Sequence, residues 1–178
     1  MTSFLIGDHV NREVGPSWTD SPDCIFCRII RQDAEAHRLY ETDKVIAFLD
    51  ILPLRPGHTL IVPKTHCARI SELPSDFAGA LGEAVAHVSR ALTEALHNTA
   101  LNVVCNQEYA QAVPHVHYHV IPAPNFGPAA TSGIKSKNIV SKRHPPTHKE
   151  MHRMEFEARE ELDDDDAREL VQKITARL

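Results

Sequence analysis

Three histidines alternate with apolar or aromatic residues between Pro114 and Pro122, where the sequence reads PHVHYHVIP. This alternation predicts a half-buried β-strand, because successive side chains of a strand point to opposite faces of the sheet. The imidazoles of His115, His117 and His119 then share one face. A solvated strand face is more often built from Lys, Glu or Thr. We therefore interpret the pattern as a chemical site and not as a polar surface that happens to carry histidine.

The spacing of these histidines limits how a metal ion could use them. Neighbouring residues on one face of a straight strand lie about 6.6 Å apart, and the two outer histidines would lie about 13 Å apart. One zinc ion with bonds of roughly 2.1 Å to nitrogen could take two neighbours but hardly all three. At least one histidine must do something else, and a neutral imidazole is available at cellular pH as a nucleophile or a base.

Length and composition set the broad class of the protein. The 178 residues suffice for one domain with a sizeable core. A net charge of −5 and a pI near 6.2 predict no general affinity for nucleic acids or membranes. No apolar run approaches the roughly 20 residues that span a bilayer, and the first residues do not resemble a signal peptide. Four cysteines are too few for a disulfide framework, which favours a reducing compartment, the cytoplasm or the nucleus.

The order of the predicted elements indicates an α+β domain around an antiparallel sheet. Strands are expected over residues 38–41, 44–50, 59–62 and 101–106. Residues 75–98 have the three-to-four-residue apolar spacing of an amphipathic helix, which Ser75 or Asp76 could cap. After a proline-rich, basic stretch, an acidic run predicts the start of a C-terminal helix, because acids suit the positive end of a helix dipole. Its apolar face would be Leu170, Val171, Ile174 and Leu178.

Two further features carry chemistry. Cys24 and Cys27 form a Cys-x-x-Cys pair, which could be a metal-binding pair, a redox dithiol or two ordinary buried cysteines. A tetrahedral zinc site needs two more ligands, and His66 and His115 could supply them. Asp50 follows the apolar stripe of the second predicted strand. Its carboxylate could accept hydrogen bonds from both hydroxyls of a ribose, or it could simply cap the turn that follows.

Together these segments resemble the histidine triad family of nucleotide hydrolases and transferases. The resemblance rests on the histidine strand, on CIFCRII from Cys24, on AFLDI from Ala47, on GHTLIVPKTH from Gly57, and on Asn106. It covers roughly residues 23–125, which leaves residues 1–22 as an N-terminal extension and 126–178 as a C-terminal tail with a terminal helix. The branch most similar to this chain is the Hint type, whose members are nucleoside phosphoramidases that release AMP from amine adducts.

The resemblance implies a role for each matching residue. His117 would be the nucleophile that forms a nucleotidyl-histidine intermediate, with His119 and His58 assisting at the phosphate and no catalytic metal required. A structural zinc would be held by Cys24, Cys27, His66 and His115. The nucleotide, a purine nucleotide such as AMP, would contact Ile25, Phe26, Ile29, Phe48, Asp50, Ile51, Leu60, Asn106, Gln111, Ala112, His117 and His119. The family also implies a two-fold homodimer whose strands join into one larger sheet.

One position departs from the family pattern. Hint-type members carry a serine in the loop before the triad, near the phosphate and the leaving group, whereas this chain has Ala112. The loss of that hydroxyl affects the expected rate and substrate preference more than the reaction type. Three alternatives remain at this level: a dinucleoside polyphosphate hydrolase of the same family, a metalloenzyme with zinc on two triad histidines, and a nucleotide-binding adaptor without activity.

Overall fold

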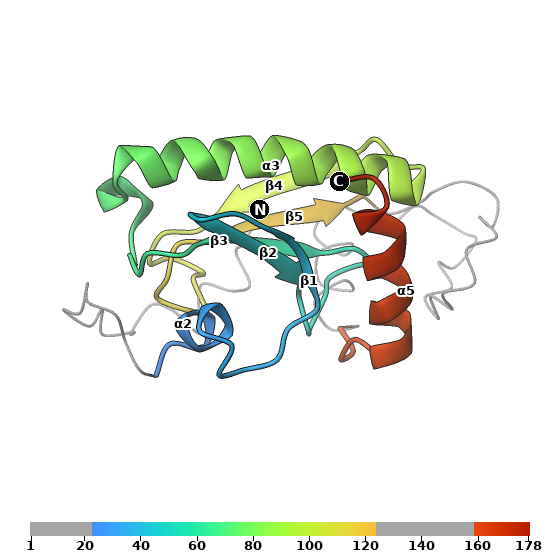
Figure 1. The fold of residues 1–178 in the computed structure, drawn as a ribbon, viewed down its shortest axis with the longest axis horizontal. Helices are drawn as coiled ribbons and strands as arrows, with labels where there is room; N and C mark the ends of the chain where they lie inside the picture. The colour runs from blue at the N-terminus through green and yellow to red at the C-terminus, as the bar shows by residue number, and fades with distance from the viewer. Residues whose placement is uncertain (1–22, 124–158) are drawn as a thin grey trace, which may run out of the picture.

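The computed structural model describes residues 23–123 and 159–178 (Figure 1). The basic stretch of the C-terminal tail and the expected boundary at residues 125 and 126 lie outside the described residues. The elements in chain order are α2 (Ile25–Ile30), β1 (Arg38–Glu41), β2 (Val45–Leu49), β3 (Thr59–Pro63), the 3₁₀ turn η1 (Ile70–Glu72), α3 (Ser75–Leu96), β4 (Leu101–Cys105), β5 (Tyr118–Pro122) and α5 (Asp164–Thr175).

The strands form a five-stranded sheet in the order β1-β2-β3-β5-β4, in which every neighbouring pair is antiparallel. The predicted α+β fold with an antiparallel sheet is confirmed. Helix α3 lies along one face of the sheet and the short helix α2 lies on the opposite side, while α5 stands across the end near β1 (Figure 1). The result is a helix–sheet–helix arrangement with two separate apolar clusters.

Strand β2 shows why the sheet can be covered on both faces. All five of its residues are buried, because alternate side chains enter different clusters. Val45, Ala47 and Leu49 pack with α3 and α5, whereas Ile46 and Phe48 pack with α2. Asp50 follows β2 directly in the chain, next after the strand that carries Ile46 and Phe48.

The long helix α3 agrees with the expected period, but the prediction of its cap is wrong. Pro74 is the residue before the first turn, and no side chain caps the helix. The Asp76 carboxylate instead pairs with Lys44 Nζ at 2.8 Å, because the sheet places that cation beside the first turn. His97 ends the helix in a left-handed conformation with φ of 50°.

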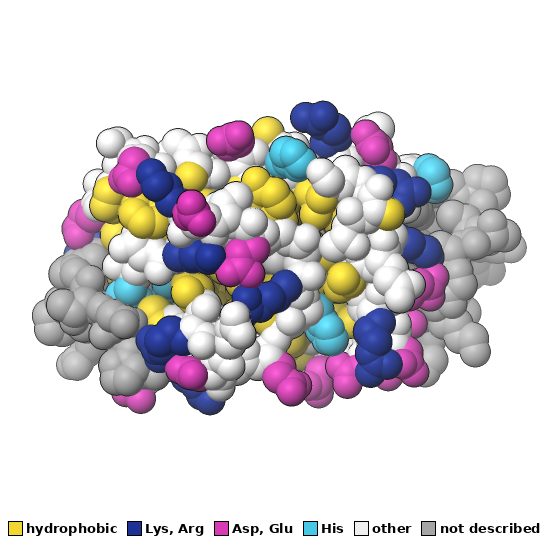
Figure 2. Space-filling view, viewed as in Figure 1, with side chains coloured by type: hydrophobic (Ala, Val, Ile, Leu, Met, Phe, Trp, Pro, Cys, Tyr) yellow, Lys and Arg dark blue, Asp and Glu magenta, His cyan; other side chains and the backbone are white. Residues whose placement is uncertain are grey.

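The acidic run before residue 167 starts a helix, as predicted. The Asp163 side chain accepts hydrogen bonds from the backbone N–H groups of Asp165 and Asp166, and acidic side chains gather around this helix start in Figure 2. Ala167, Leu170 and Ile174 are buried in the same core as α3. Helix α5 is therefore part of the main core, and the Leu162 N–H donates to the Ile51 carbonyl at 2.9 Å. None of the described helices combines the length and apolar character needed to cross a bilayer.

Candidate active site and metal centre

The histidine segment is only partly a strand. The predicted strand began at Pro114, but β5 begins at Tyr118, so the first half of that prediction is wrong. Pro114 has no N–H to give to a ladder, the His115 N–H donates to Val113 O, and the Val116 N–H donates to Cys67 O at 2.6 Å. The chain therefore bends before β5. The rings of His117 and His119 lie 4.8 Å apart between centroids, while His115 is directed to a different group of side chains.

That group brings together four residues from distant parts of the chain, and their ligand atoms all lie within 4.8 Å of one another: Cys24, Cys27, His66 and His115. Nδ1 of His66 lies 3.2 Å from Cys27 Sγ, and Nδ1 of His115 lies 3.5 Å from Cys24 Sγ and 3.6 Å from Cys27 Sγ. Ligand atoms around a tetrahedral zinc ion lie roughly 3.3–3.8 Å apart. Three of the separations within the group lie close to this range, so the four side chains could hold a metal ion.

The protonation of His115 also suits a metal ligand. Its Nε2–H donates to the carbonyl of Pro63 at 2.9 Å, so the lone pair of the neutral ring is on Nδ1, facing the sulfurs. Such an outer hydrogen bond fixes the tautomer of a ligating histidine. Burial lowers the pKa of His115 to about 4, which keeps the ring neutral as ligation requires. A closed set of two thiols and two imidazoles is typical of structural sites.

His117 lies beside this group but does not belong to it. Its side chain is 2% exposed, and its ring packs edge-on against Phe26 at 5.1 Å between centroids. Nδ1–H donates to the backbone carbonyl of His115 at 2.6 Å. In the neutral ring this leaves the lone pair on Nε2, and burial lowers the pKa of His117. The imidazole is held in the form that can attack an electrophile.

His58 and His119 form a second hydrogen-bonded pair, with 2.9 Å between Nε2 of His58 and Nδ1 of His119. Two groups compete for Nδ1 of His58: the Leu54 N–H donates to it at 3.2 Å, and an Asp50 carboxylate oxygen lies 3.3 Å from it. With Nδ1 accepting from Leu54, Nε2 of neutral His58 carries the proton and donates it to His119. Nε2 of neutral His119 then carries a proton and is a donor. Burial lowers the pKa of His58 to about 4 and that of His119 to about 3, so both rings are neutral near pH 7.

Gly57 places His58 by bringing the backbone close to α3. Its φ is +84°, and a Cβ on this residue would lie 2.8 Å from Leu96 Cδ1. A side chain larger than that of glycine would be strained by this conformation and would press against Leu96. The glycine of the GHTLIVPKTH segment is therefore explained by backbone packing.

Asp50 combines the two roles that the sequence left open. One carboxylate oxygen accepts the Leu52 N–H at 3.0 Å, which is the turn-capping role. The other lies 3.3 Å from Nδ1 of His58, at the edge of the histidine cluster. Asp50, His58 and His119 also lie close enough to share a cation, but this group holds one triad histidine and not the two that the metalloenzyme alternative requires.

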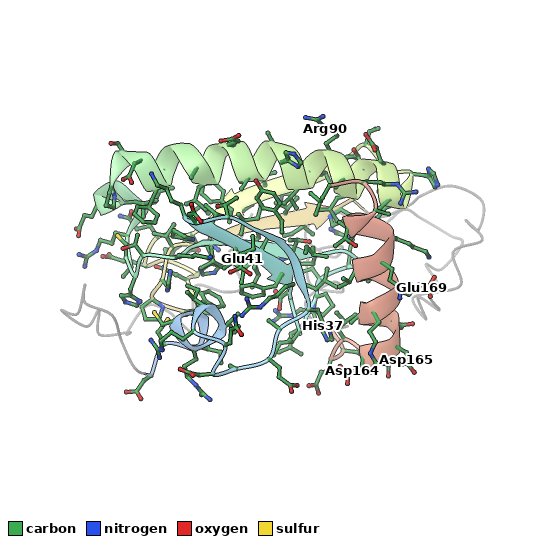
Figure 3. All side chains as sticks on the ribbon, viewed as in Figure 1. His37, Glu41, Arg90, Asp164, Asp165 and Glu169 are labelled. Carbon is green, nitrogen blue, oxygen red and sulfur yellow. The ribbon has the colours of Figure 1, made fainter. Side chains whose placement is uncertain are left out.

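The apolar residues expected around a nucleotide base fall into two sets. Phe26, Ile29, Phe48 and Leu60 are buried in the cluster below α2. Ile25 and Ile51 are exposed, by 39% and 58% respectively. A groove of about 780 Å³ continues beside Ile51, lined by residues 32–38 and Asp164. Figure 3 shows His37 and Asp164 at the start of α5, where Nε2 and Oδ1 lie 3.3 Å apart.

The loop before the triad holds Asn106, Gln111 and Ala112. The Asn106 Nδ2 amide donates to the Ala110 carbonyl at 3.2 Å, and the Gln111 amide is buried among backbone groups. Sequence reasoning missed Arg159 and Arg55, whose positive charges both lower the pKa of His58, by less than burial does. Nothing in the sequence marks Arg159, because it reaches the site only through the packing of α5 on the core.

Comparisons with known proteins agree with this geometry. The HIT domain family matches residues 31–125, just over half of the chain. An adenosine 5'-monophosphoramidase of Schizosaccharomyces pombe is 40% identical over 103 residues, which cover 57% of this chain and 75% of that protein. An adenylylsulfatase of Arabidopsis thaliana is 37% identical over 102 residues, which cover 56% of this chain and 52% of that protein.

Solved structures show the same fold. A hypothetical histidine triad nucleotide-binding protein from Sulfolobus tokodaii matches with a TM-score of 0.69 and 27% identity, over 86% of this chain and 91% of that one. A zinc-bound histidine triad protein from Mycobacterium smegmatis matches with a TM-score of 0.56 and 29% identity, over 84% of this chain and 97% of that one. That protein is zinc-bound, and the cysteine and histidine group of this chain could hold a metal ion.

Proposed function

The chain belongs to the HIT domain family, and from this premise we propose that it hydrolyses purine nucleoside 5'-phosphoramidates to AMP and an amine. The observation that carries the proposal is the state of His117. This imidazole is buried, its Nδ1–H is held by the His115 carbonyl, and its Nε2 has the free lone pair. The similarity to the adenosine 5'-monophosphoramidase of Schizosaccharomyces pombe supports this substrate class.

The reaction proceeds in two displacements. Nε2 of His117 attacks the α-phosphorus, the bond from phosphorus to the amine nitrogen breaks, and the departing amine takes up a proton from solvent. Positive charge develops on the His117 ring, and the hydrogen bond from Nδ1–H to the His115 carbonyl stabilises it. Water then attacks the same phosphorus, loses a proton to solvent and breaks the bond to Nε2, which releases AMP and restores the neutral imidazole. Splitting one difficult displacement into two easier ones is the gain from covalent catalysis.

His58 and His119 supply hydrogen-bond donation to this reaction. Their pairing leaves a proton on Nε2 of His119, which can donate to the phosphate or to the departing amine. Because both rings are neutral near pH 7, they polarise the phosphate without repelling each other as two cations would. The Asp50 carboxylate accepts hydrogen bonds from the ribose hydroxyls. The base packs against Ile51 and the apolar cluster of Phe26, Ile29, Phe48 and Leu60.

Zinc is the metal that the cysteine and histidine group fits best. Bound there, it would supply no chemistry to the phosphate, because the four protein ligands close its coordination. Cys24, Cys27, His66 and His115 would use it to tie α2 and the end of β3 to the segment that carries the nucleophile. The low cysteine content of the sequence supports a reducing compartment, the cytoplasm or the nucleus.

A homodimer completes the proposal. Of the two edge strands in the described sheet, β1 is contacted by α5, while β4 exposes Asn102 and Val103. An exposed edge strand is a template for pairing with another chain. A second copy pairing antiparallel to β4 would continue the sheet across a two-fold axis.

A substrate panel tests the function. Turnover is measured with AMP-lysine and AMP-morpholidate, with diadenosine polyphosphates, and with adenylyl sulfate, the substrate class suggested by the Arabidopsis relative. We expect the phosphoramidates to be hydrolysed fastest. Faster turnover of the polyphosphates or of adenylyl sulfate would assign the chain to another branch. AMP binding without turnover of any compound would favour the adaptor alternative.

A trapping experiment tests the intermediate. Rapid quenching of the wild type with a phosphoramidate, under alkaline denaturing conditions that preserve the acid-labile P–N bond, should capture a nucleotide on His117. His117→Ala should lower turnover by several orders of magnitude and leave AMP affinity within a few fold, since its neighbours cannot take over a nucleophile's role. A nucleotide mapped to another residue, or near-normal turnover of the variant, would overturn the mechanism.

A further inference from the structure

The Gln111 side chain is hydrogen-bonded to three backbone groups of its surroundings. The residue is 4% exposed. Its Oε1 accepts the Glu108 N–H at 2.8 Å, and its Nε2 donates to the Ala68 carbonyl at 2.8 Å and to the His115 carbonyl at 3.4 Å. The oxygen and both amide hydrogens therefore have partners, and the orientation of the amide follows from them.

One of these partners is shared with the nucleophile. The His115 carbonyl accepts both the Gln111 amide and, at 2.6 Å, the Nδ1–H of His117. A carbonyl oxygen has two lone pairs and can accept both bonds. The peptide group between His115 and Val116 is thus oriented by Gln111, and this peptide group decides which nitrogen of His117 carries the proton.

The loop that carries Gln111 is anchored and conformationally unusual. Glu108 and Ala110 have φ of 59° and 57°, in the left-handed region that side chains other than those of Asn and Asp rarely adopt. Such backbone persists only where the surroundings hold it. Here Arg69 Nε pairs with the Glu108 carboxylate, and the Ser71 N–H donates to Gln107 Oε1 at 3.1 Å. These contacts attach the loop to the segment around η1.

We propose that Gln111 is a positioning residue, which holds His117 with its lone pair on Nε2 by orienting the His115 carbonyl, and that it does not contact the phosphate. The proposal rests on the proposed function for the identity of the nucleophile. It replaces the role that the family resemblance implied, in which Gln111 contacts the nucleotide. Because the amide is already bound to three backbone groups, contact with a phosphate would require it to leave them.

The test uses Gln111→Met, which keeps the length of the side chain but cannot form the three hydrogen bonds of the Gln111 amide. Gln107→Met is the matched control, since it removes one bond from a glutamine of the same loop to the backbone but has none to His115. The first readout is ¹⁵N NMR of the His117 ring in the folded, metal-loaded protein without substrate. The wild type and Gln107→Met should show a protonated Nδ1, whereas Gln111→Met should show the proton shared between both nitrogens.

Kinetics supply the second readout. In Gln111→Met, the rate of nucleotide transfer to His117 should fall by about tenfold or more, while AMP affinity stays within about threefold, as expected for a residue that acts through another. A wild-type tautomer with a wild-type rate would overturn the proposal. So would a large loss of AMP affinity with the tautomer unchanged, because it would show direct contact with the nucleotide.

A measurement on the wild type covers the case in which Gln111→Met does not fold. Titration with AMP should leave the Gln111 side-chain amide signals nearly unshifted while backbone signals of the loop move. A large shift of the side-chain signals would overturn the proposal. Failure of the proposed function would look different: no nucleotide of the panel would be hydrolysed, yet the tautomer of His117 would still depend on Gln111.

Discussion

Burial determines the charge of the histidines in this site. His58 and His117 are 3% and 2% exposed, and removal from water disfavours the charged imidazolium. The negative charge of Asp50 opposes part of this effect at His58 but does not reverse it. A nucleophile must be unprotonated to attack and a neutral imidazole can still donate one hydrogen bond, so this environment suits both parts of the proposed mechanism.

The same burial predicts how stability depends on pH. The pKa of His58 is lowered from 6.5 to about 4 on folding, so between these pH values the unfolded chain binds more protons than the folded one. The stability is fully present above about pH 6.5 and is lost as the pH falls toward 4. Urea unfolding across this range should show the fall, and His58→Gln should make it shallower at equal metal content. An identical pH dependence in the variant would contradict the assignment.

Asp50 gives a prediction about the ribose. Asp50→Ala should weaken binding of AMP by about tenfold or more, since a charge-assisted hydrogen bond contributes roughly 1.5–3 kcal/mol. The 2',3'-dideoxy counterpart should lose much less affinity. Asp50→Asn keeps an oxygen for the Leu52 N–H and so controls for the turn. Equal losses for both ligands, or a wild-type Asp50→Asn alongside a damaged Asp50→Ala, would leave Asp50 as a turn residue.

At the scale of elements, the cysteine and histidine group connects parts that the sheet alone does not join. Cys24 and Cys27 lie at the start of α2, which has six residues and is too short to be stable by itself. His66 follows β3, and His115 lies in the bend before β5. A metal ion bound by all four would attach α2 to the sheet and stabilise the bend that carries His117.

Metal analysis should therefore find close to one zinc per chain. Cys24→Ala with Cys27→Ala should lose the metal and lower the free energy of unfolding, because binding energy at a structural site is folding energy. Cys105→Ala is the control, since that thiol lies on β4, outside the group. A double variant that keeps its zinc would show that the assignment of ligands is wrong.

At the scale of the whole molecule, the two edges of the described sheet differ. Helix α5 buries Ala167, Leu170 and Ile174 in the core and contacts β1, so that edge is covered from within the chain. Val103 on β4 is 42% exposed. The difference indicates which edge a second copy would use.

The wild type should accordingly sediment as a dimer. Val103→Asp should shift it toward the monomer, because antiparallel pairing across a two-fold axis brings like charges together. Arg90→Asp changes charge on the outer side of α3 (Figure 3) and should leave the dimer intact. A wild type that is monomeric at micromolar concentration, or a Val103→Asp protein that remains dimeric, would contradict pairing through β4.

Sequence alone determined what depends on local periodicity. The apolar spacing of residues 75–98 predicted α3, and the pattern of the strand expected over residues 44–50 put Asp50 on one face with Ile46 and Phe48. These predictions succeed because helix and strand periods are properties of the backbone itself. The alternation of the three histidines likewise pointed to a shared chemical site.

Only the tertiary structure decided how distant segments meet. The bend before β5 separates His115 from His117, the Gln111 amide turns to the His115 carbonyl, and α5 brings the charge of Arg159 near His58. Pro74 precedes α3 and offers no side-chain cap, and the Asp76 carboxylate pairs with Lys44 from the sheet. Contacts of this kind depend on packing between residues far apart in the chain, and no period in the sequence encodes them.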